Sequence, residues 1–419
     1  LSLVEFSATS FVWPPHYLFV ALGIGIAIAG TAIISQLIGS GDRAQAESYA
    51  SHIFYFCLGL GVVFSVAGSV LSPSIVRWMG GTGDLGRHAT TYLSILMAGF
   101  IFEMLYLAFF SILGAQGKTK ITTIISASAA VLNAVLDPLF IFDRVPFIGI
   151  PGLGLGIAGA ALATVLSQVI RVLLGVYAIC SSHNEVRLKV RKVRFSGVQF
   201  GELIRKGFPT ALGQASAALG FTLLNSEIVL YGDATMAAYA AVNRVASFDM
   251  QPTAGIGGAL TAIVGQNMGA GQKDRVKAFN RTAFRYITAM AIAGSLLLWF
   301  LRYPALSLFI RETGPEADLV WRLSLDYMLF NALMTPAMGY FDAYTGIFSG
   351  AGYPKYAAYM SILRLWAVRL PMIWAFRYLT KLGPTGVWIS MLASNIVIII
   401  FAQILYRKER WLESPRIRA

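Results

Sequence analysis

The feature that most constrains this chain is a succession of long apolar segments separated by short polar turns. A helix rises about 1.5 Å per residue, so about 20 apolar residues span the roughly 30 Å hydrocarbon core of a bilayer. Unpaired backbone groups are costly in lipid, so such spans are predicted to be helices. Eleven segments qualify, near residues 11–38, 50–76, 89–113, 120–142, 154–180, 207–231, 235–266, 283–308, 321–348, 355–378 and 384–406. The sequence therefore predicts an all-α polytopic membrane protein.

Composition supports this interpretation and argues against several functions. Hydrophobic residues make up 57% of the chain and charged residues 13%, whereas soluble domains carry about 25% charged residues. Cys57 and Cys180 both lie in apolar segments and the four histidines are scattered, so no disulfide framework or zinc spacing is indicated. No Ser/His or Cys/His catalytic set is visible. We expect neither an enzyme nor a resident cofactor.

The positions of the basic residues predict the orientation. If the polar stretch 181–206 is cytoplasmic, 21 of the 33 Lys and Arg residues fall on the cytoplasmic side, eight on the opposite side and four within spans. Basic residues concentrate in cytoplasmic loops, so the C-terminus is predicted to be cytoplasmic. The net charge of +13 is then expected to face anionic lipid rather than nucleic acid.

Three segments recur in the same order in the two halves of the chain. Ser35–Arg43 (SQLIGSGDR) matches Gly265–Gln272 (GQNMGAGQ) at an offset of 230 residues. The other pairs have offsets of about 235 and 227: GAQGKTK of 114–120 with GAGYPK of 350–355, and LGIAGA of 155–160 with LGPTGV of 382–387. An even number of spans separates the copies, so we predict parallel repeats related by an axis along the membrane normal.

The repeats also predict the domain organisation. We expect a first bundle over residues 1–180, a basic cytoplasmic connector over 181–206, a second bundle over 207–406 and a cytoplasmic tail over 407–419. The second bundle holds six predicted spans and the first only five, so the counterpart of 207–231 is expected to be missing from the first. We therefore expect two six-helix bundles in the full-length protein, with the first transmembrane helix preceding Leu1.

Asn133, Asp137 and Pro138 form the most informative polar group within a span. Residues four apart share a helical face, so the amide and the carboxyl can point at one spot. Pro138 cannot donate a hydrogen bond to the carbonyl of Ala134, which weakens the helix there. A charged Asp near mid-bilayer costs roughly 2.5–3.5 kcal/mol on insertion scales and marks an ion or proton site by default. The alternative is a polar helix contact beside a structural kink.

These motifs together resemble the multidrug and toxic compound extrusion (MATE) family. The resemblance rests on VGQNMGAG of 264–271, preceded by Arg244 and Pro252, with the matching turn that contains Gln36, Gly39 and Gly41 in the first half. Gln266, Gly269 and Gly271 are the corresponding second-half positions. The run LNAVLDP of 132–138 is similar to the fifth helix of the DinF-like and archaeal branch. The resemblance covers the whole chain.

The resemblance implies a two-lobed secondary transporter that exchanges Na+ or H+ inward for organic, often cationic, drugs outward. In this branch the cation site matches Asn133 and Asp137, joined by an Asp of the first helix that has no counterpart here. Oxygen donors suit Na+, and a desolvated carboxylate can carry a proton, so the coupling ion stays open. The resemblance further implies a monomer in a prokaryotic inner membrane, whose partners are small molecules and lipid.

Further acids lie within predicted spans. Glu227 and Asp342 lie on the two helices that carry a second-half cation site in the NorM-like branch, and we expect them to form a secondary cation or substrate site. They could instead be cavity-facing residues that only set a preference for cationic cargo. Glu103 is a third acid of this kind. Arg244 is expected to have a structural role, and Arg364 and Arg369 are expected to snorkel or to pair with acids.

Two functions stay open at this stage. The first is a cation-coupled multidrug antiporter, and the second is a lipid-linked oligosaccharide flippase of the same superfamily. Flippases of this kind tend to have a strongly cationic cavity, so the four acids Glu103, Asp137, Glu227 and Asp342 favour the first. GAQGK of 114–118 lacks the full spacing of a nucleotide-binding loop, so we do not expect coupling to ATP.

Overall fold

The computed structural model describes residues 3–146, 149–180, 184–190, 195–310 and 314–413, and these are almost entirely helical. Parts of the predicted connector (181–183 and 191–194) and of the predicted tail (414–419) lie outside the described residues. The chain divides into two compact units, the first running to Ala215 and the second beginning at Ser216. This boundary falls within helix α7 (Gly197–Val229), so the last ten residues of the predicted connector are helical.

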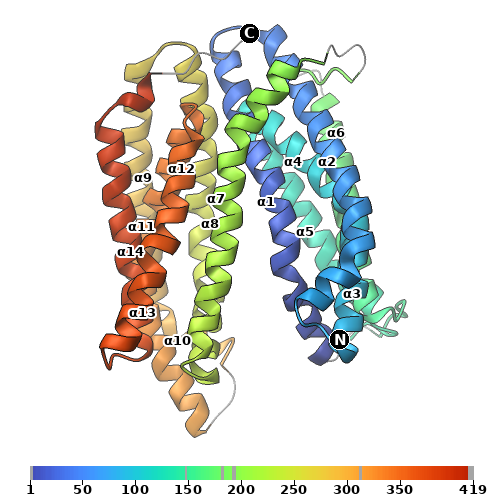
Figure 1. Cartoon of the computed structure of the whole chain (residues 1–419), viewed down its shortest axis with the longest axis vertical. Helices are drawn as coiled ribbons and strands as arrows, with labels where there is room; N and C mark the ends of the chain where they lie inside the picture. The colour runs from blue at the N-terminus through green and yellow to red at the C-terminus, as the bar shows by residue number, and fades with distance from the viewer. Residues whose placement is uncertain (1–2, 147–148, 181–183, 191–194, 311–313, 414–419) are drawn as a thin grey trace. The chain divides into compact units, whose positions relative to one another are not determined.

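In its described residues, the first unit consists of six helices and the beginning of α7 (Figure 1). Its buried core contains large apolar side chains such as Tyr49, Phe100 and Phe109. The helices are α1 (Leu3–Gly39), α2 (Arg43–Trp78), α3 (Gly83–Ala98), α4 (Phe100–Ala115), α5 (Thr119–Ile141) and α6 (Gly156–Cys180).

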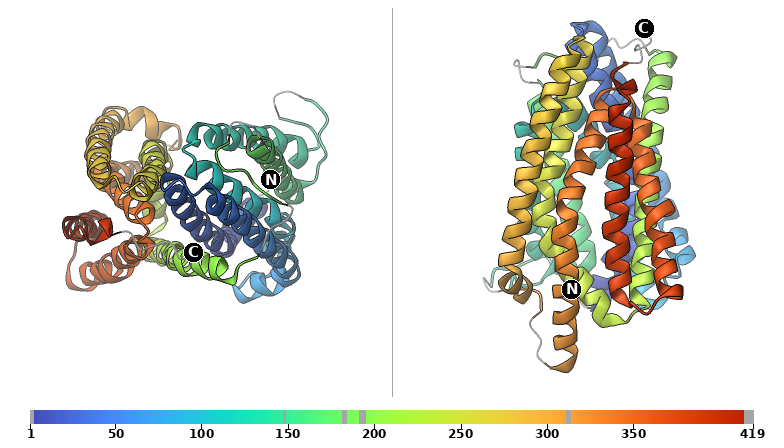
Figure 2. Two further views of the ribbon diagram at one scale, coloured as in Figure 1. Left: turned by 90° about the horizontal axis from the view of Figure 1, so that it is seen from above. Right: turned by 90° about the vertical axis from the view of Figure 1, so that its left-hand side faces the viewer.

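The second unit contains the end of α7 and the remaining helices, with α11 packed against α8, α9 and α14 (Figures 1 and 2). The helices are α8 (Asp233–Gly269), α9 (Lys273–Phe300), α10 (Arg302–Ser307), α11 (Pro315–Gly350), α12 (Pro354–Ile362), α13 (Leu370–Leu379) and α14 (Pro384–Arg407). A π-helical segment, η1 (Leu363–Arg369), joins α12 to α13, and a 3₁₀ turn, η2 (Arg410–Leu412), follows α14.

The three predicted repeat pairs are confirmed at the backbone level. After α1, Asp42 donates its N–H to the Leu37 carbonyl (3.0 Å), and after α8, Gln272 donates to Asn267 (2.9 Å). Gly41 (φ 82°) and Gly271 (φ 70°) occupy the left-handed position that each turn requires. The second pair places Gly117 and Gly352 at positive φ, and the third places Gly156 and Gly383 there. The two units therefore share the same turn geometry.

Three predicted spans are interrupted among the described residues. The predicted span 283–308 runs through α9 and α10, with Leu301 between the two helices. The predicted span 89–113 consists of α3 and α4, which meet at Gly99 with a bend of 46°. The predicted span 355–378 contains the π-helical turn of η1. Among the described residues, six helices are long and apolar enough to cross a membrane, or seven if α3 and α4 form one span. The other predicted spans are helical but too short or too polar for that criterion, so the total of eleven stays a prediction.

Helices α8 and α11 approach each other through glycines. A methyl group on Gly346 would lie 2.1 Å from the carbonyl oxygen of Gly257, and one on Gly350 would lie 2.5 Å from that of Thr261. Small residues four apart let two backbones come into contact, as is common between helices in membranes. This contact holds α11, and with it Asp342, directly against α8.

Candidate functional site

Asn133 and Asp137 lie on one face of α5, as their spacing in the sequence predicts. The Asn133 amide donates to Asp137 Oδ1 at 3.3 Å, and both side chains are half-buried. Tyr92 of α3 lies within electrostatic range of the Asp137 carboxylate. Carboxylate and amide oxygens, with the carbonyl that Pro138 leaves free, are hard donors of the kind that a small cation takes.

The C-terminal end of α5 is held by the loop that follows it. The helix continues past Pro138 to Ile141, and loop N–H groups bond back to its last carbonyls, from Leu153 to Leu139 (2.8 Å) and from Leu155 to Phe140 (2.9 Å). These bonds satisfy carbonyls that a helix terminus otherwise leaves unpaired. The last turn of α5 therefore has a fixed position one turn beyond the Asn133–Asp137 pair.

Glu103 on α4 is neutralised by its neighbours. Arg171 of α6 lies 2.7 Å from Glu103 Oε2, and the Gln168 amide donates to the same oxygen at 2.8 Å. The Arg171 guanidinium also stacks over the ring of Tyr106, 4.1 Å from its centroid. Because the Arg171 guanidinium already balances its charge, Glu103 does not require an ion from solution to stabilise it.

Glu227 on α7 is also paired within the protein. The guanidinium of Arg377 lies 3.0 Å from Glu227 Oε2, and the indole N–H of Trp374 donates to Oε1 at 2.9 Å. Both partners come from α13. The predicted secondary site at this residue is thus an internal ion pair in the structure.

Asp342 on α11 faces a buried arginine. Arg364 of η1 is 4% exposed and is the charged group that acts electrostatically on Asp342. The guanidinium stacks over Phe341 at 4.2 Å and donates to the sulfur of Met338. In the described part of the chain, Glu227 and Asp342 form no hydrogen bond with each other, and each has its own arginine.

The π-helical segment explains why two arginines are buried on one stretch of chain. Residues five apart lie on different faces of an α-helix, whereas the i→i+5 bonds of a π-helix bring them towards one face. The N–H of Leu370 indeed bonds to the Leu365 carbonyl at the end of η1. Arg369 is 2% exposed and donates to Ser394 and Asn395 of α14, each at 2.9 Å. A pattern search on a 3.6-residue period does not detect this arrangement.

The family-motif residues have structural positions. Gln36 is buried near the end of α1, and the Gln36 and Gln266 carbonyls accept N–H groups of their turns at 2.9 and 3.0 Å. Gly39 and Gly269 are the last residues of their helices, just before the positive-φ glycines. Arg244 and Pro252 lie within α8, and both are exposed within the described chain.

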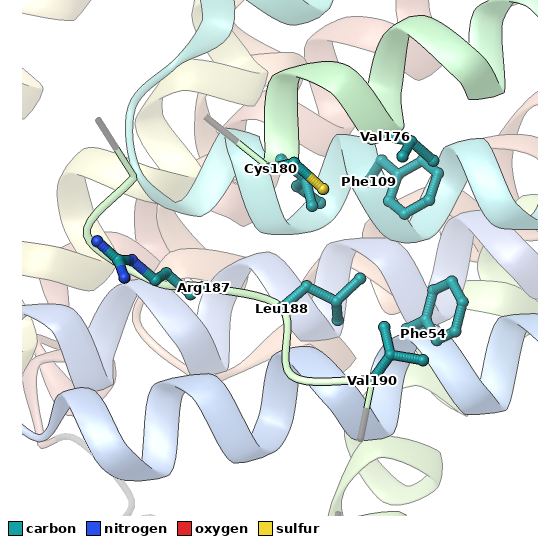
Figure 3. A pocket seen from close by; sticks show the side chains of 8 residues that line it. Phe54, Phe109, Val176, Cys180, Arg187, Leu188 and Val190 are labelled. Carbon is teal, nitrogen blue, oxygen red and sulfur yellow. The ribbon is translucent and has the colours of Figure 1, made fainter. Parts of the chain in front are cut away.

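A separate pocket of about 410 Å³ lies in the first unit, where α2, α4 and α6 meet residues 187–190. Figure 3 shows Phe109 and Val176 next to each other, with Phe54, Leu188 and Val190 opposite them. Among the described residues of its lining, Arg187 is the charged one, and none is an acid. Across the described residues, no cluster of three or more His, Cys, Asp or Glu side chains is present.

Comparison with known proteins identifies the family. A family model described as MatE matches residues 1–139 and 209–375. The probable multidrug resistance protein YoeA of Bacillus subtilis is 27% identical over 416 residues, which cover 96% of this chain and 87% of the relative. The multidrug export protein MepA of Staphylococcus aureus is 23% identical over 405 residues, covering 96% of this chain and 85% of the relative.

Solved structures share the fold. A MOP superfamily transporter from Pyrococcus furiosus superposes with a TM-score of 0.88 at 23% identity, covering 99% of this chain and 90% of that one. A multidrug resistance MATE family transporter in an outward-facing conformation gives a TM-score of 0.86 over the same shares of both chains. The family model matches well over half of the chain, and the helical fold agrees with it. The chain is therefore a multi-pass membrane protein of the MatE family, the MATE transporters.

Proposed function

We propose that this protein exports organic, often cationic, compounds in exchange for inward Na+ or H+, and that the ion loads at Asp137. Family membership supports a transport function, and the names of relatives such as the multidrug export protein MepA support drugs as cargo. The site of action in this proposal is a prokaryotic inner membrane, where the protein acts as a monomer with its C-terminus in the cytoplasm.

The observation that carries the proposal is the contrast between Asp137 and the other three acids. Glu103 and Glu227 form ion pairs with arginines, and Asp342 has Arg364 as its charged neighbour. Within the described residues, no arginine or lysine forms an ion pair with Asp137, which has Asn133 as its hydrogen-bonding partner. A carboxylate in a membrane without an internal counter-charge is stabilised by an external cation or a proton.

In the proposed mechanism, Asn133 orients the carboxylate and the free carbonyl of Ala134 supplies a further donor. Occupation of the site by a cation removes the electrostatic penalty of the charged side chain. Pro138 removes one backbone hydrogen bond of α5, so the helix can bend at this point. In this proposal, loading of the cation changes the bend at Pro138, which is the differential interaction that alternating access requires.

The test is efflux of a fluorescent cationic dye from proteoliposomes, with a Na+ gradient and a pH gradient imposed separately. We expect wild type to respond to one of the gradients and Asp137→Asn to lose that response, because an amide cannot exchange a proton or balance a cation. Asp143→Asn is the matched control, since Asp143 is an exposed residue just beyond the end of α5. Full gradient-driven efflux by Asp137→Asn would overturn the proposal.

The buried arginines favour a second candidate function. The acids Glu103, Glu227 and Asp342 each have an arginine nearby, so they no longer argue for cationic cargo, and Arg364 and Arg369 are nearly fully buried. Guanidinium groups suit an anionic group, such as the cargo of a lipid-linked oligosaccharide flippase. If the protein moves no dye under either gradient, translocation of a fluorescent lipid-linked oligosaccharide in the same vesicles is the assay that supports this alternative.

A further inference from the structure

The second unit carries a groove that is formed by α9, α11 and α14. Three adjoining cavities of about 360, 440 and 450 Å³ make up this groove. Tyr340 of α11 lines all three, and Tyr344 and Gln403 line two of them. Since α11 packs against both α9 and α14, α11 forms the floor and the other two helices form the walls.

The floor of the groove presents fixed hydroxyl groups. Tyr340 and Tyr344 are four residues apart and so lie on one face of α11. The Tyr340 hydroxyl shares a hydrogen bond of 2.6 Å with Thr288 of α9, and the Tyr344 hydroxyl donates to Gln403 of α14. Thr288 donates its own hydroxyl to the Phe284 carbonyl (2.7 Å), so both tyrosines donate within the floor, and these bonds hold the two rings in place.

One end of the groove is basic. Arg281 and Arg285 extend from α9 and Arg407 from α14, and all three are exposed cavity-lining residues. No ion pair to a carboxylate engages these three arginines in the described chain, whereas the neighbouring Lys277 is paired with Glu409 at 2.6 Å. Arginine guanidiniums with free donors bind phosphate in a geometry that fits its oxygens.

The other part of the groove is apolar. Ile292 on α9 and Ile400 and Ile404 on α14 line it, and they are 51%, 56% and 50% exposed. Exposed isoleucines on membrane-spanning helices contact the acyl chains of lipids. The groove is therefore amphipathic along its length, with cationic side chains at one end and hydrocarbon at the other.

We propose that this groove binds an anionic phospholipid. The phosphate would lie among Arg281, Arg285 and Arg407, and an acyl chain would follow the isoleucines. The basic end belongs to the side that carries most Lys and Arg residues, which the loop charges place in the cytoplasm, where anionic lipids attract basic segments. This binding does not depend on the identity of the exported compound.

The test is native mass spectrometry of the purified protein titrated with dioleoylphosphatidylglycerol or dioleoylphosphatidylcholine. We expect tighter binding of phosphatidylglycerol, because phosphatidylcholine offers no net negative charge. In Arg281→Gln/Arg285→Gln, binding of phosphatidylglycerol should weaken roughly fivefold for each charge removed, and the preference should shrink accordingly. The melting temperature of each variant in detergent shows that it is folded.

Two further variants distinguish binding of the lipid in the groove from general electrostatic attraction between the basic protein and an anionic lipid. Arg275→Gln removes a charge from α9 outside the cavity lining and should leave the preference intact. Ala289→Trp fills the apolar part without changing charge, so it should weaken binding of the dioleoyl lipid but not of dihexanoylphosphatidylglycerol. Equal binding of the two dioleoyl lipids by wild type would overturn the proposal, as would an effect of Arg275→Gln equal to that of one groove substitution.

Discussion

At the scale of single residues, the acids within the helices differ in whether a cationic side chain lies beside them. Asp137 has an amide as its partner, whereas Glu103 accepts bonds from both Arg171 and Gln168. Both acids lie within apolar helices and look alike in the sequence. Their predicted behaviour differs because a paired carboxylate is a structural group and an unpaired one needs a counter-ion.

This distinction predicts a stability effect at Glu103. Glu103→Gln leaves the Arg171 guanidinium, whose side chain is 20% exposed, without its anionic partner. We expect a loss of about 1–3 kcal/mol in the free energy of unfolding, the cost of an unsatisfied buried group. A thermal melt in detergent measures the effect.

The control for that experiment is Asp84→Asn. Asp84 and Arg87 form an ion pair whose side chains are 68% and 78% exposed, and pairs of this kind contribute about 0–1 kcal/mol. Equal melting temperatures for the two variants would show that Arg171 does not need the charge of Glu103.

At the scale of the helix, close backbone contact and local helix type position the side chains. Helices α8 and α11 touch through Gly257 and Gly346, and the π-helical turn of η1 directs Arg364 and Arg369 into the unit. Both features depend on a neighbouring helix. The glycines of this contact therefore set how near Asp342 lies to α8.

The glycine contact predicts a large effect from a small substitution. Gly346→Ala places a methyl group 2.1 Å from the Gly257 carbonyl oxygen, so the helices must separate, and we expect destabilisation of about 1–3 kcal/mol. Gly258→Ala is the control, because no atom lies within 4 Å of its added methyl group. Melting temperatures of both variants test this, and a Gly346→Ala protein as stable as Gly258→Ala would contradict the packing.

At the scale of the whole molecule, the positions of the basic residues and of the repeated turns predict on which side of the membrane each loop lies. Lys273, at the start of α9, belongs to the basic side, and Lys381, between α13 and α14, belongs to the opposite side. Both positions are exposed. Because basic residues are retained in the cytoplasm, the two positions should be accessible from opposite sides of the membrane.

Cysteine labelling tests this topology. In a Cys180→Ser background, with Cys57 fully buried, Lys381→Cys should react with a membrane-impermeant thiol reagent in intact cells. Lys273→Cys should react only in inverted vesicles. Protection in both preparations would call for another pair of positions in the same loops, and the reverse labelling pattern would show that the predicted orientation is wrong.

Much of this molecule follows from local patterns in the chain. Apolar length predicts the helices because lipid leaves the backbone few alternatives. The recurring glycine turns predict the repeat because a positive φ is favourable for glycine, and Gly41 and Gly271 confirm it. The pairing of Asn133 with Asp137 also follows from spacing alone, because residues four apart on one helix need no tertiary information to meet.

Tertiary structure decided what surrounds each charged group. Glu227 meets Arg377 across 150 residues of sequence, and Glu103 meets Arg171 across 68. Neither separation in the sequence follows the helical period, because such pairs form where two helices pack together and not within one helix. Local patterns therefore predict the helices, the repeat and the pairing of Asn133 with Asp137, whereas only the packing of the helices shows which acids have a cationic side chain beside them.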